Sequence, residues 1–155
     1  MRETLNVDIC VIGGGSGGLS VAAGAAQMGS DTVLLEKNKM GGDCLNYGCI
    51  PSKALLAAGD AAQVVRDSDL FGLRTRGMEP RLEDVYGKLH DVIRAIEPND
   101  SVERFEGLGV RVISAAGRFV GRQEVEADGI HIKARRIVVS TGSAPSIPSL
   151  QGFDH

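Results

Sequence analysis

The sequence has no tryptophan, few other aromatic residues and no long apolar run. Four Phe and two Tyr are too few to build the stacking surfaces that hold single-stranded nucleic acid. Charges of both signs are interspersed and sum to −3 over 155 residues, so no basic face is available for a phosphate backbone. No stretch approaches the roughly 20 apolar residues that cross a bilayer. We therefore expect neither a nucleic-acid nor a membrane partner.

Histidine and cysteine are also scarce. His90, His131 and His155 are scattered along the chain, so they do not form a cluster that could complete a tetrahedral metal site. The start of the chain lacks the pattern of a signal peptide, and three cysteines do not make a disulfide framework. We expect a cytoplasmic protein in which Cys10, within an apolar run, is an inert buried thiol.

Glycine is abundant, and its 21 residues cluster at 13–18 and 41–48. The hydrophobic pattern alternates between helical and strand periods. It predicts strands over 5–12 and 32–36, a helix over 16–28, a glycine-rich loop over 40–48, a helix over 51–66, a loop over 67–80 and two helices within 81–108 that break at Pro98. Further strands are predicted over 110–113, 116–120, 123–127, 129–133 and 136–140. The pattern therefore predicts an α/β fold with a parallel sheet, long helices and an inserted three-stranded β-meander.

A glycine fingerprint lies between the first strand and the first helix. Gly13 allows a tight turn, Gly15 lets the backbone approach a pyrophosphate, and Gly18 lets the helix pack closely on the strand. Glu36 ends the second strand, where a carboxylate can accept the hydroxyls of an adenosine ribose. A glycine-rich turn with a surface glutamate is the simpler alternative. Because the strand, the glycines, the helix and Glu36 occur in the expected order, the pattern favours a Rossmann-like dinucleotide site. It does not distinguish an FAD site from an NAD site.

Cys44 and Cys49 follow this unit and are five residues apart. Positions i and i+5 of a regular helix lie roughly 9 Å apart at Cα, whereas a disulfide needs less than about 7 Å. A disulfide therefore requires a distorted turn. Gly48 permits unusual dihedrals, and Pro51 is expected to push Ile50 out of the α region.

Pro51 suits the first turn of the helix that follows, so Cys49 is expected at the positive end of that helix. This position lowers a thiol pKa and favours the thiolate. Lys53, four residues beyond Cys49, adds a cation near the thiolate or a bound flavin. Two alternatives remain: both cysteines are structural, or they are half of a metal site. The absence of a second ligand cluster favours redox use.

The block 41–53 resembles that of the flavin-dependent pyridine nucleotide–disulfide oxidoreductases, the family of dihydrolipoamide dehydrogenase, glutathione reductase and mercuric reductase. The segment 140–142 is similar to the Ala-Thr-Gly turn of that family. The resemblance implies that FAD is the cofactor and that Lys53 lies near flavin N5. It further implies that Cys49 is the charge-transfer thiol and that Cys44 is the interchange thiol that attacks the substrate.

By the same resemblance, a set of residues is expected to hold FAD, with Cys44, Cys49 and Lys53 as the catalytic group. The cofactor-binding residues are Gly13, Gly15, Ser16, Gly18, Glu36, Lys37, Gly42, Asp43, Cys44, Gly48, Cys49, Lys53, Ser140, Thr141 and Gly142. Asp43 stands where the family usually has Thr, Tyr47 where Val is common and Ser140 where Ala is usual. The first two border the sulfurs and leave the substrate open.

The family also carries parts that these 155 residues do not contain: a second fingerprint for NAD(P)H, a later FAD segment and a dimerisation domain with a His-Pro pair. We expect residues 1–143 to be the first segment of an FAD-binding domain and 144–155 to be a linker. The chain is then the N-terminal piece of a homodimeric enzyme, inactive alone. Its substrate is a small disulfide or dithiol, or a soft metal ion. A non-catalytic FAD- or ADP-binding fragment and a thiol-based metal binder are the alternatives.

Overall fold

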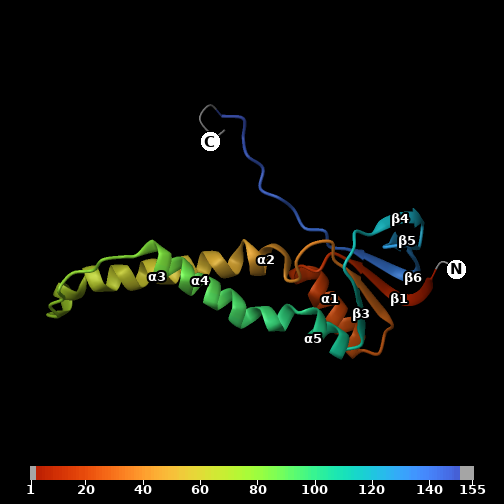
Figure 1. Cartoon of the computed structure of the whole chain (residues 1–155), viewed down its shortest axis with the longest axis horizontal. Helices are drawn as coiled ribbons and strands as arrows, with labels where there is room; N and C mark the ends of the chain where they lie inside the picture. Colours follow the sequence, from red (N-terminus) through yellow and green to blue (C-terminus); the bar gives the residue numbers. More distant parts are fainter. Residues whose placement is uncertain (1–2, 151–155) are drawn as a thin grey trace.

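The computed structural model describes residues 3–150 and contains a six-stranded mixed sheet (Figure 1). The strand order is β3-β2-β1-β6-β5-β4. The first four of these strands run parallel, and β5 and β4 extend the sheet in antiparallel pairing. The strands are β1 (Thr4–Ile12), β2 (Thr32–Leu35), β3 (Val110–Ile113), β4 (Arg118–Gly121), β5 (Glu124–Ala127) and β6 (Ile130–Val139). The expected Rossmann-like α/β architecture is confirmed.

The helices divide into those that lie against the sheet and those that extend away from it. The helical segments are α1 (Ser16–Gln27), α2 (Gly42–Asn46), α3 (Cys49–Arg66), η1 (Ser68–Phe71), α4 (Leu82–Ile96), η2 (Glu97–Asp100) and α5 (Val102–Gly107). The break expected at Pro98 is present, because the 3₁₀ turn η2 separates α4 from α5. The expected loop over 67–80 is partly wrong, since its first residues form the 3₁₀ helix η1.

One long strand replaces two that were predicted separately. Residues 129–133 and 136–140 were expected to be distinct, but β6 runs through both without a break. The reason is that β6 pairs with β1 on both sides of Arg135, from His131 to Val139, so the strand continues through the residues between the two predicted strands. The first part of β6 is therefore the third strand of the β4–β5–β6 meander, while its whole length pairs with β1.

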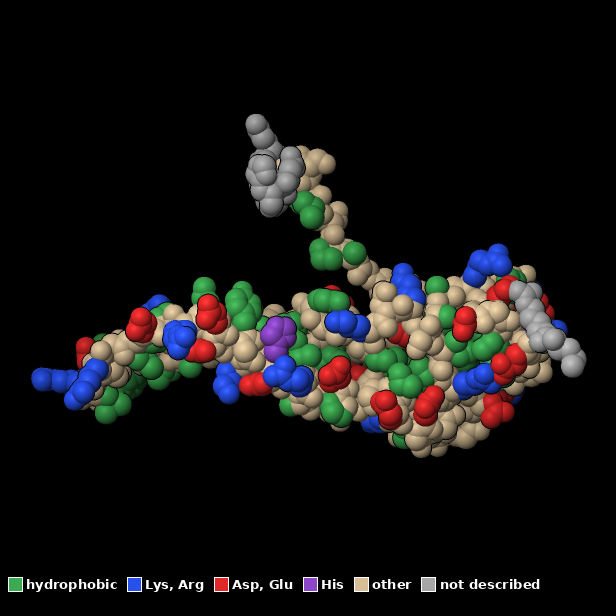
Figure 2. All heavy atoms as spheres, viewed as in Figure 1, with side chains coloured by type: hydrophobic (Ala, Val, Ile, Leu, Met, Phe, Trp, Pro, Cys, Tyr) green, Lys and Arg blue, Asp and Glu red, His purple; other side chains and the backbone are tan. Residues whose placement is uncertain are grey.

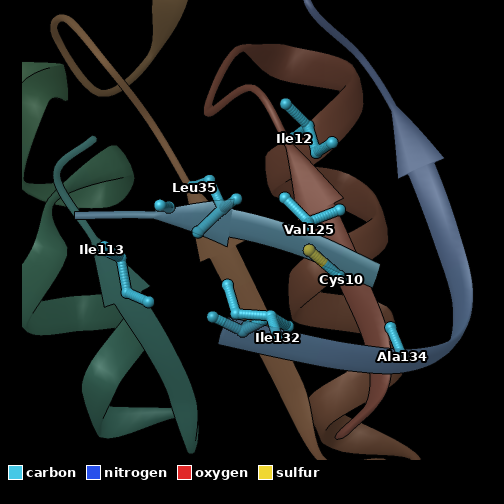
Figure 3. Close-up of a cluster of buried hydrophobic side chains, with 9 residues drawn as sticks. Cys10, Ile12, Leu35, Ile113, Val125, Ile132 and Ala134 are labelled. Carbon is cyan, nitrogen blue, oxygen red and sulfur yellow. The ribbon is translucent and has the colours of Figure 1, made fainter. Parts of the chain in front are cut away.

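Apolar side chains alternate between the two faces of the sheet and form two clusters. On one face, side chains of β1 and β2 contact α1 and α5; the buried members are Val11, Leu19, Ala22, Leu34, Phe105 and Val110. On the other face, Val125 of β5 lies over Cys10 and Leu35, although β5 is separated from β2 in the strand order (Figure 3). The antiparallel end of the sheet therefore curls over the parallel part and encloses this second cluster.

Helices α3 and α4 lie side by side and extend away from the sheet as a hairpin (Figure 1). The structure buries none of the described residues of α3 and only Leu89 of α4. Hydrophobic side chains are visible at the surface of this hairpin (Figure 2), and Leu56 and Val64 are about two-thirds exposed. Within residues 3–150, no helix is long and apolar enough to span a membrane.

The final segment was expected to be a linker. Residues 144–150 form neither helix nor strand and run away from the sheet (Figure 1). Residues 151–155, the rest of that expected linker, lie outside the described residues.

Candidate active site

A cleft of about 700 Å³ opens at the carboxyl ends of the parallel strands. Open α/β sheets bind ligands at this edge, and the volume lies within the usual range for small-molecule sites. The loops that follow β1, β2, β3 and β6, together with α2, supply its walls. The lining residues are Ile12, Gly13, Gly15, Leu35, Glu36, Lys37, Asn38, Lys39, Gly42, Asp43, Asn46, Tyr47, Ala115, Ala116, Gly117, Ser140, Thr141, Gly142 and Ser143.

The turn after β1 brings the N-terminus of α1 to the cleft. Gly13 has a φ of +110°, which glycine adopts without strain. A Cβ atom on Gly18 would overlap the Gly13 carbonyl oxygen, so only glycine lets α1 approach β1 this closely. Gly15 is the N-cap of α1 and supplies no side-chain hydrogen bond. The positive end of a 12-residue helix therefore lies beside the cleft, an arrangement that favours an anionic ligand.

Glu36, which lies directly after β2, accepts hydrogen bonds from the backbone of the glycine turn and from the backbone of its own loop. Its Oε2 accepts a hydrogen bond from the N–H of Gly14 at 2.6 Å, and its Oε1 accepts one from the N–H of Asn38 at 2.6 Å. Each carboxylate oxygen has a second lone pair, so the group retains acceptor capacity toward a ligand hydroxyl. The carboxylate thus fixes the glycine turn and still lines the cleft.

Ser140, at the end of β6, fixes the other side of the glycine turn. Its Oγ donates to the carbonyl oxygens of Ile12 at 3.0 Å and Gly13 at 3.1 Å, and its N–H donates to Ile12 at 2.9 Å. The next residues, Thr141 and Gly142, line the cleft. The sequence pointed to this segment, and the hydroxyl gives it a contact that an alanine would lack.

The segment expected to be a glycine-rich loop over 40–48 is in part the short helix α2, so this prediction was wrong in its middle. The loop before α2 contacts the glycine turn directly: the N–H of Gly41 donates to the Gly14 carbonyl at 2.9 Å. A Cβ on Gly42 would lie 2.7 Å from the Cα of Gly15. These two glycine segments therefore pack backbone against backbone.

Asn46 connects the end of α2 to that loop. Its Nδ2 donates to the carbonyl oxygens of Met40 at 3.0 Å and Gly42 at 2.8 Å. Asn46 is half-buried and also lines the cleft. Sequence analysis did not select it, although a carboxamide between two cysteines and close to several glycines is a usable signal.

Cys44 and Cys49 are both free thiols, with Cys44 half-buried and Cys49 exposed. A side-chain hydrogen bond between them raises the pKa of the Cys44 thiol, and partial burial raises it further. The positive charge of Lys53 acts in the opposite direction and lowers the pKa of Cys44. The two sulfurs are therefore neighbours across the α2–α3 turn, with a cation nearby.

The distortion of this turn was predicted correctly for one residue and wrongly for another. Gly48 adopts φ −108° and ψ −104°, and a Cβ there would lie 2.5 Å from Asp43 Oδ2. Ile50, however, is helical, because α3 begins at Cys49 rather than at Pro51. Pro51 is still within the first turn, where a missing N–H leaves no helical bond unmade, so it does not break the helix.

Most of the residues selected from the sequence line the cleft, but the two cysteines do not. Nine of them are among its lining residues: Gly13, Gly15, Glu36, Lys37, Gly42, Asp43, Ser140, Thr141 and Gly142. Of the described residues, Ser16, Gly18, Cys44, Gly48, Cys49 and Lys53 are not in the lining. Asp43 and Tyr47, which lie before and after Cys44 in the sequence, do line it.

Sequence analysis also missed part of the wall. Asn38 and Lys39 extend the segment that was selected at Glu36 and Lys37. The loop over 115–117 belongs to the wall because β3 lies beside β2, an adjacency that requires the sheet order. No local sequence signal marks that loop.

No group of three or more His, Cys, Asp or Glu side chains that could hold a metal ion occurs within residues 3–150. Within the described residues, the two thiols therefore belong to no cluster of three such side chains that could hold a metal ion. A resident tetrahedral metal needs four ligands, so this pair alone does not provide such a site.

The family profile of the pyridine nucleotide-disulphide oxidoreductases matches residues 7–155. The chain belongs to this family. A mercuric reductase of Lysinibacillus sphaericus is 29% identical over 149 residues, which are 96% of this chain and 27% of that protein. A dihydrolipoyl dehydrogenase of Chlamydia trachomatis is 37% identical over 145 residues, covering 89% of this chain and 30% of that protein.

A dihydrolipoyl dehydrogenase of Synechocystis sp. is 33% identical over 162 residues, covering 100% of this chain and 34% of that protein. The chain thus spans only about a quarter to a third of the length of these relatives. Both kinds of relative match the same region, and the match alone does not choose between their substrates.

Proposed function

We propose that this chain is the cofactor- and thiol-bearing portion of an FAD-dependent, NAD(P)H-linked oxidoreductase that acts on a disulfide, a dithiol or a soft metal ion. The observation that carries the proposal is the pair of neighbouring thiols, Cys44 and Cys49, next in the chain to residues of α2 that line a cleft at the strand ends. Family membership supports the same reaction class. The rest of a homodimeric enzyme would supply the nicotinamide site.

The cleft fits the dinucleotide part of FAD. The glycine backbones at Gly15 and Gly42 leave room for close approach, and the N-terminus of α1 attracts an anionic pyrophosphate. Glu36 has acceptor capacity left for ribose hydroxyls, while Lys37 and the segment 140–142 complete the wall. When bound, FAD supplies the two-electron redox chemistry that connects a nicotinamide to the sulfurs.

The chain's own sulfurs perform thiol–disulfide exchange. The Cys44 thiolate attacks one sulfur of a substrate disulfide, whose S–S bond breaks, and the leaving thiolate takes up a proton. The Cys49 thiolate then attacks the Cys44 sulfur of the mixed disulfide and releases the second substrate thiol. The substrate gains two electrons and two protons, and Cys44 and Cys49 become a disulfide. Lys53 favours the attacking thiolate because its charge lowers the pKa of Cys44.

A redox titration of the purified chain with added FAD tests this proposal. We expect visible flavin absorption that shifts on partial reduction, and two thiols that appear together when the pair is reduced. Cys44→Ser and Cys49→Ser should each abolish the paired thiols and the spectral shift. Cys10→Ala is the matched control, because the Cys10 thiol is fully buried in the sheet. A colourless protein that binds only ADP-like ligands would contradict the redox role and favour a binding module.

The soft-metal substrate requires a separate experiment. Titration of free thiols before and after addition of Hg(II) should show loss of both thiols in the wild type and of one thiol in either serine variant. If the prereduced pair reduces a small disulfide and the number of free thiols does not change when Hg(II) is added, the disulfide is favoured as the substrate. Each result chooses one substrate class within the proposed reaction.

A further inference from the structure

We infer that Asn46 is a positioning residue that links the turn carrying Cys44 and Cys49 to the ligand-binding cleft, and that it keeps ligand affinity similar in the dithiol and disulfide states. The observation is a continuous set of contacts. Asn46 lies between the two cysteines in sequence, and its amide group binds the carbonyl of Met40, in the loop before α2, and that of Gly42, the first residue of α2. This inference rests on the proposed function for the identity of the ligand, and it adds a link between two sites.

The segment held by Asn46, from the end of the loop before α2 to its first residue, forms part of the ligand site. Gly41 donates to Gly14, and Gly42 packs against the Cα of Gly15 at a distance that only glycine permits. Gly15 and Gly42 both line the cleft. A shift of this loop therefore moves the glycine turn that receives the pyrophosphate.

Asn46 also belongs to the short helix that carries one of the two sulfurs and leads into the turn before the other. Cys44 lies within α2, and Asn46 is the last residue of that five-residue helix. The N–H groups of Tyr47 and Gly48 both donate to the Asp43 carbonyl, at 2.9 and 2.6 Å, which closes the turn before Cys49. A helix this short is not stable on its own, so its geometry depends on contacts such as those of Asn46.

A disulfide would change what holds this turn. A bond between Cys44 and Cys49 would hold the turn covalently, whereas in the dithiol state the Asn46 amide supplies the link to the loop. Loss of Asn46 should therefore matter more in the dithiol state than in the disulfide state. Without Asn46, ligand affinity should therefore depend on redox state, and because linkage is reciprocal, the redox equilibrium should then depend on the ligand.

Asn46→Ala tests the coupling, with Asn38→Ala as the matched control. Asn38 also lines the cleft, and its bond to Glu36 uses only its backbone N–H, which alanine retains. Isothermal titration with ADP and with FAD is carried out on the dithiol and the disulfide forms of the full chain. We expect Asn46→Ala to weaken binding about tenfold in the dithiol form, as loss of two hydrogen bonds implies, and much less in the disulfide form. Asn38→Ala should change the nucleotide affinity of the dithiol and disulfide forms by the same factor.

A second measurement needs no nucleotide. Glutathione disulfide oxidises the pair while two glutathione thiols form, so the equilibrium gives the stability of the Cys44–Cys49 bond. Asn46→Ala should shift this equilibrium toward the dithiol by about tenfold, because a looser turn holds the sulfurs together less often. Asn38→Ala should leave it unchanged.

The outcomes separate the two proposals. A wild-type chain that binds neither ADP nor FAD contradicts the proposed function, while the glutathione equilibrium still decides the role of Asn46 in the sulfur turn. If Asn46→Ala is folded by circular dichroism and matches the wild type in nucleotide affinity and glutathione equilibrium, the inference is wrong. An equal loss of affinity in both redox states would also overturn it, because that would show a contact with the ligand and no coupling.

Discussion

At the scale of single residues, the site depends on glycines that lack a Cβ and on polar side chains that bond the backbone around them. Gly18 and Gly42 leave space that a Cβ would fill, and this space lets backbone segments pack directly on one another. The polar side chains Glu36, Asn46 and Ser140 then bond the backbone of those segments. Close packing of main chain at the glycine turn therefore helps to form the cleft, and its sequence signature is the glycines.

Gly18→Ala should destabilise the chain, because its Cβ would overlap the Gly13 carbonyl oxygen. We expect a loss of at least about 2 kcal/mol in the free energy of unfolding, measured by urea denaturation. Gly17→Ala is the control in the neighbouring position, where nothing lies within 4 Å of the added Cβ. The free energy of unfolding of Gly17→Ala should be about 0.5 to 1 kcal/mol higher than that of the wild type. Equal stabilities for the two variants would show that α1 can move away from β1 at little cost.

Cys49→Ala should lower the pKa of Cys44 toward that of an ordinary thiol, because the hydrogen bond with Cys49 is the largest cause of its elevation. The thiolate fraction at a given pH near neutrality then rises, and iodoacetamide labels Cys44 faster. Lys53→Ala should have the opposite effect, since the cation lowers this pKa. Mass spectrometry over a series of pH values gives the labelling rate of each cysteine. Slower labelling of Cys44 in Cys49→Ala would contradict the assigned cause.

At the scale of elements, the sheet and the α3–α4 hairpin differ in what they bury. Sequence periodicity located nearly every strand and helix, because amphipathic patterns report burial on one face. It failed where contacts outside a segment decide where the segment begins, ends or continues. The continuity of β6 depends on pairing with β1, and the start of α3 at Cys49 depends on the turn closed by Asp43. The loop over 115–117 joins the cleft only through strand order.

Helix α3 should open locally far more readily than β1. Its described residues include none that is buried, whereas Cys10 and Val11 in β1 have no exposed surface. Few buried apolar contacts mean a low free energy of local opening. In hydrogen exchange, we expect amides of 55–66 to show protection factors at least about tenfold below those of 4–12. Equal protection would show that an additional contact, such as self-association, covers the hairpin.

At the scale of the whole molecule, the cleft collects segments from across the chain. Its walls extend from the first strand to the loop after the last one, with α2 between them. A ligand that bridges these walls binds only the folded form and therefore stabilises it by mass action. Fold class and most cleft residues were predictable from the sequence, but their convergence on one cavity required the sheet order.

FAD should raise the melting temperature of the wild type, and Gly15→Ala should remove this effect. At a ligand concentration about 100 times Kd the stabilisation is about 2.7 kcal/mol. An added Cβ at Gly15 lies 3.8 Å from its nearest protein neighbour, so the unliganded variant should melt like the wild type. The added Cβ would nevertheless occupy space at the cleft wall, where we propose that FAD binds. Gly17→Ala should retain the FAD-dependent shift, and a full shift in Gly15→Ala would place the ligand elsewhere.

The pairing of β1 with β6 has a consequence for how the polypeptide is made. Residues 4–12 find their second neighbour in residues 131–139, more than a hundred positions later in synthesis. Contacts of such sequence separation form slowly, because a long loop must close first. During translation the first strand therefore waits with one unpaired edge until β6 has emerged. We expect nascent chains that stop before β6 to be protease-sensitive and to depend on chaperones, which ribosome-bound truncations would measure.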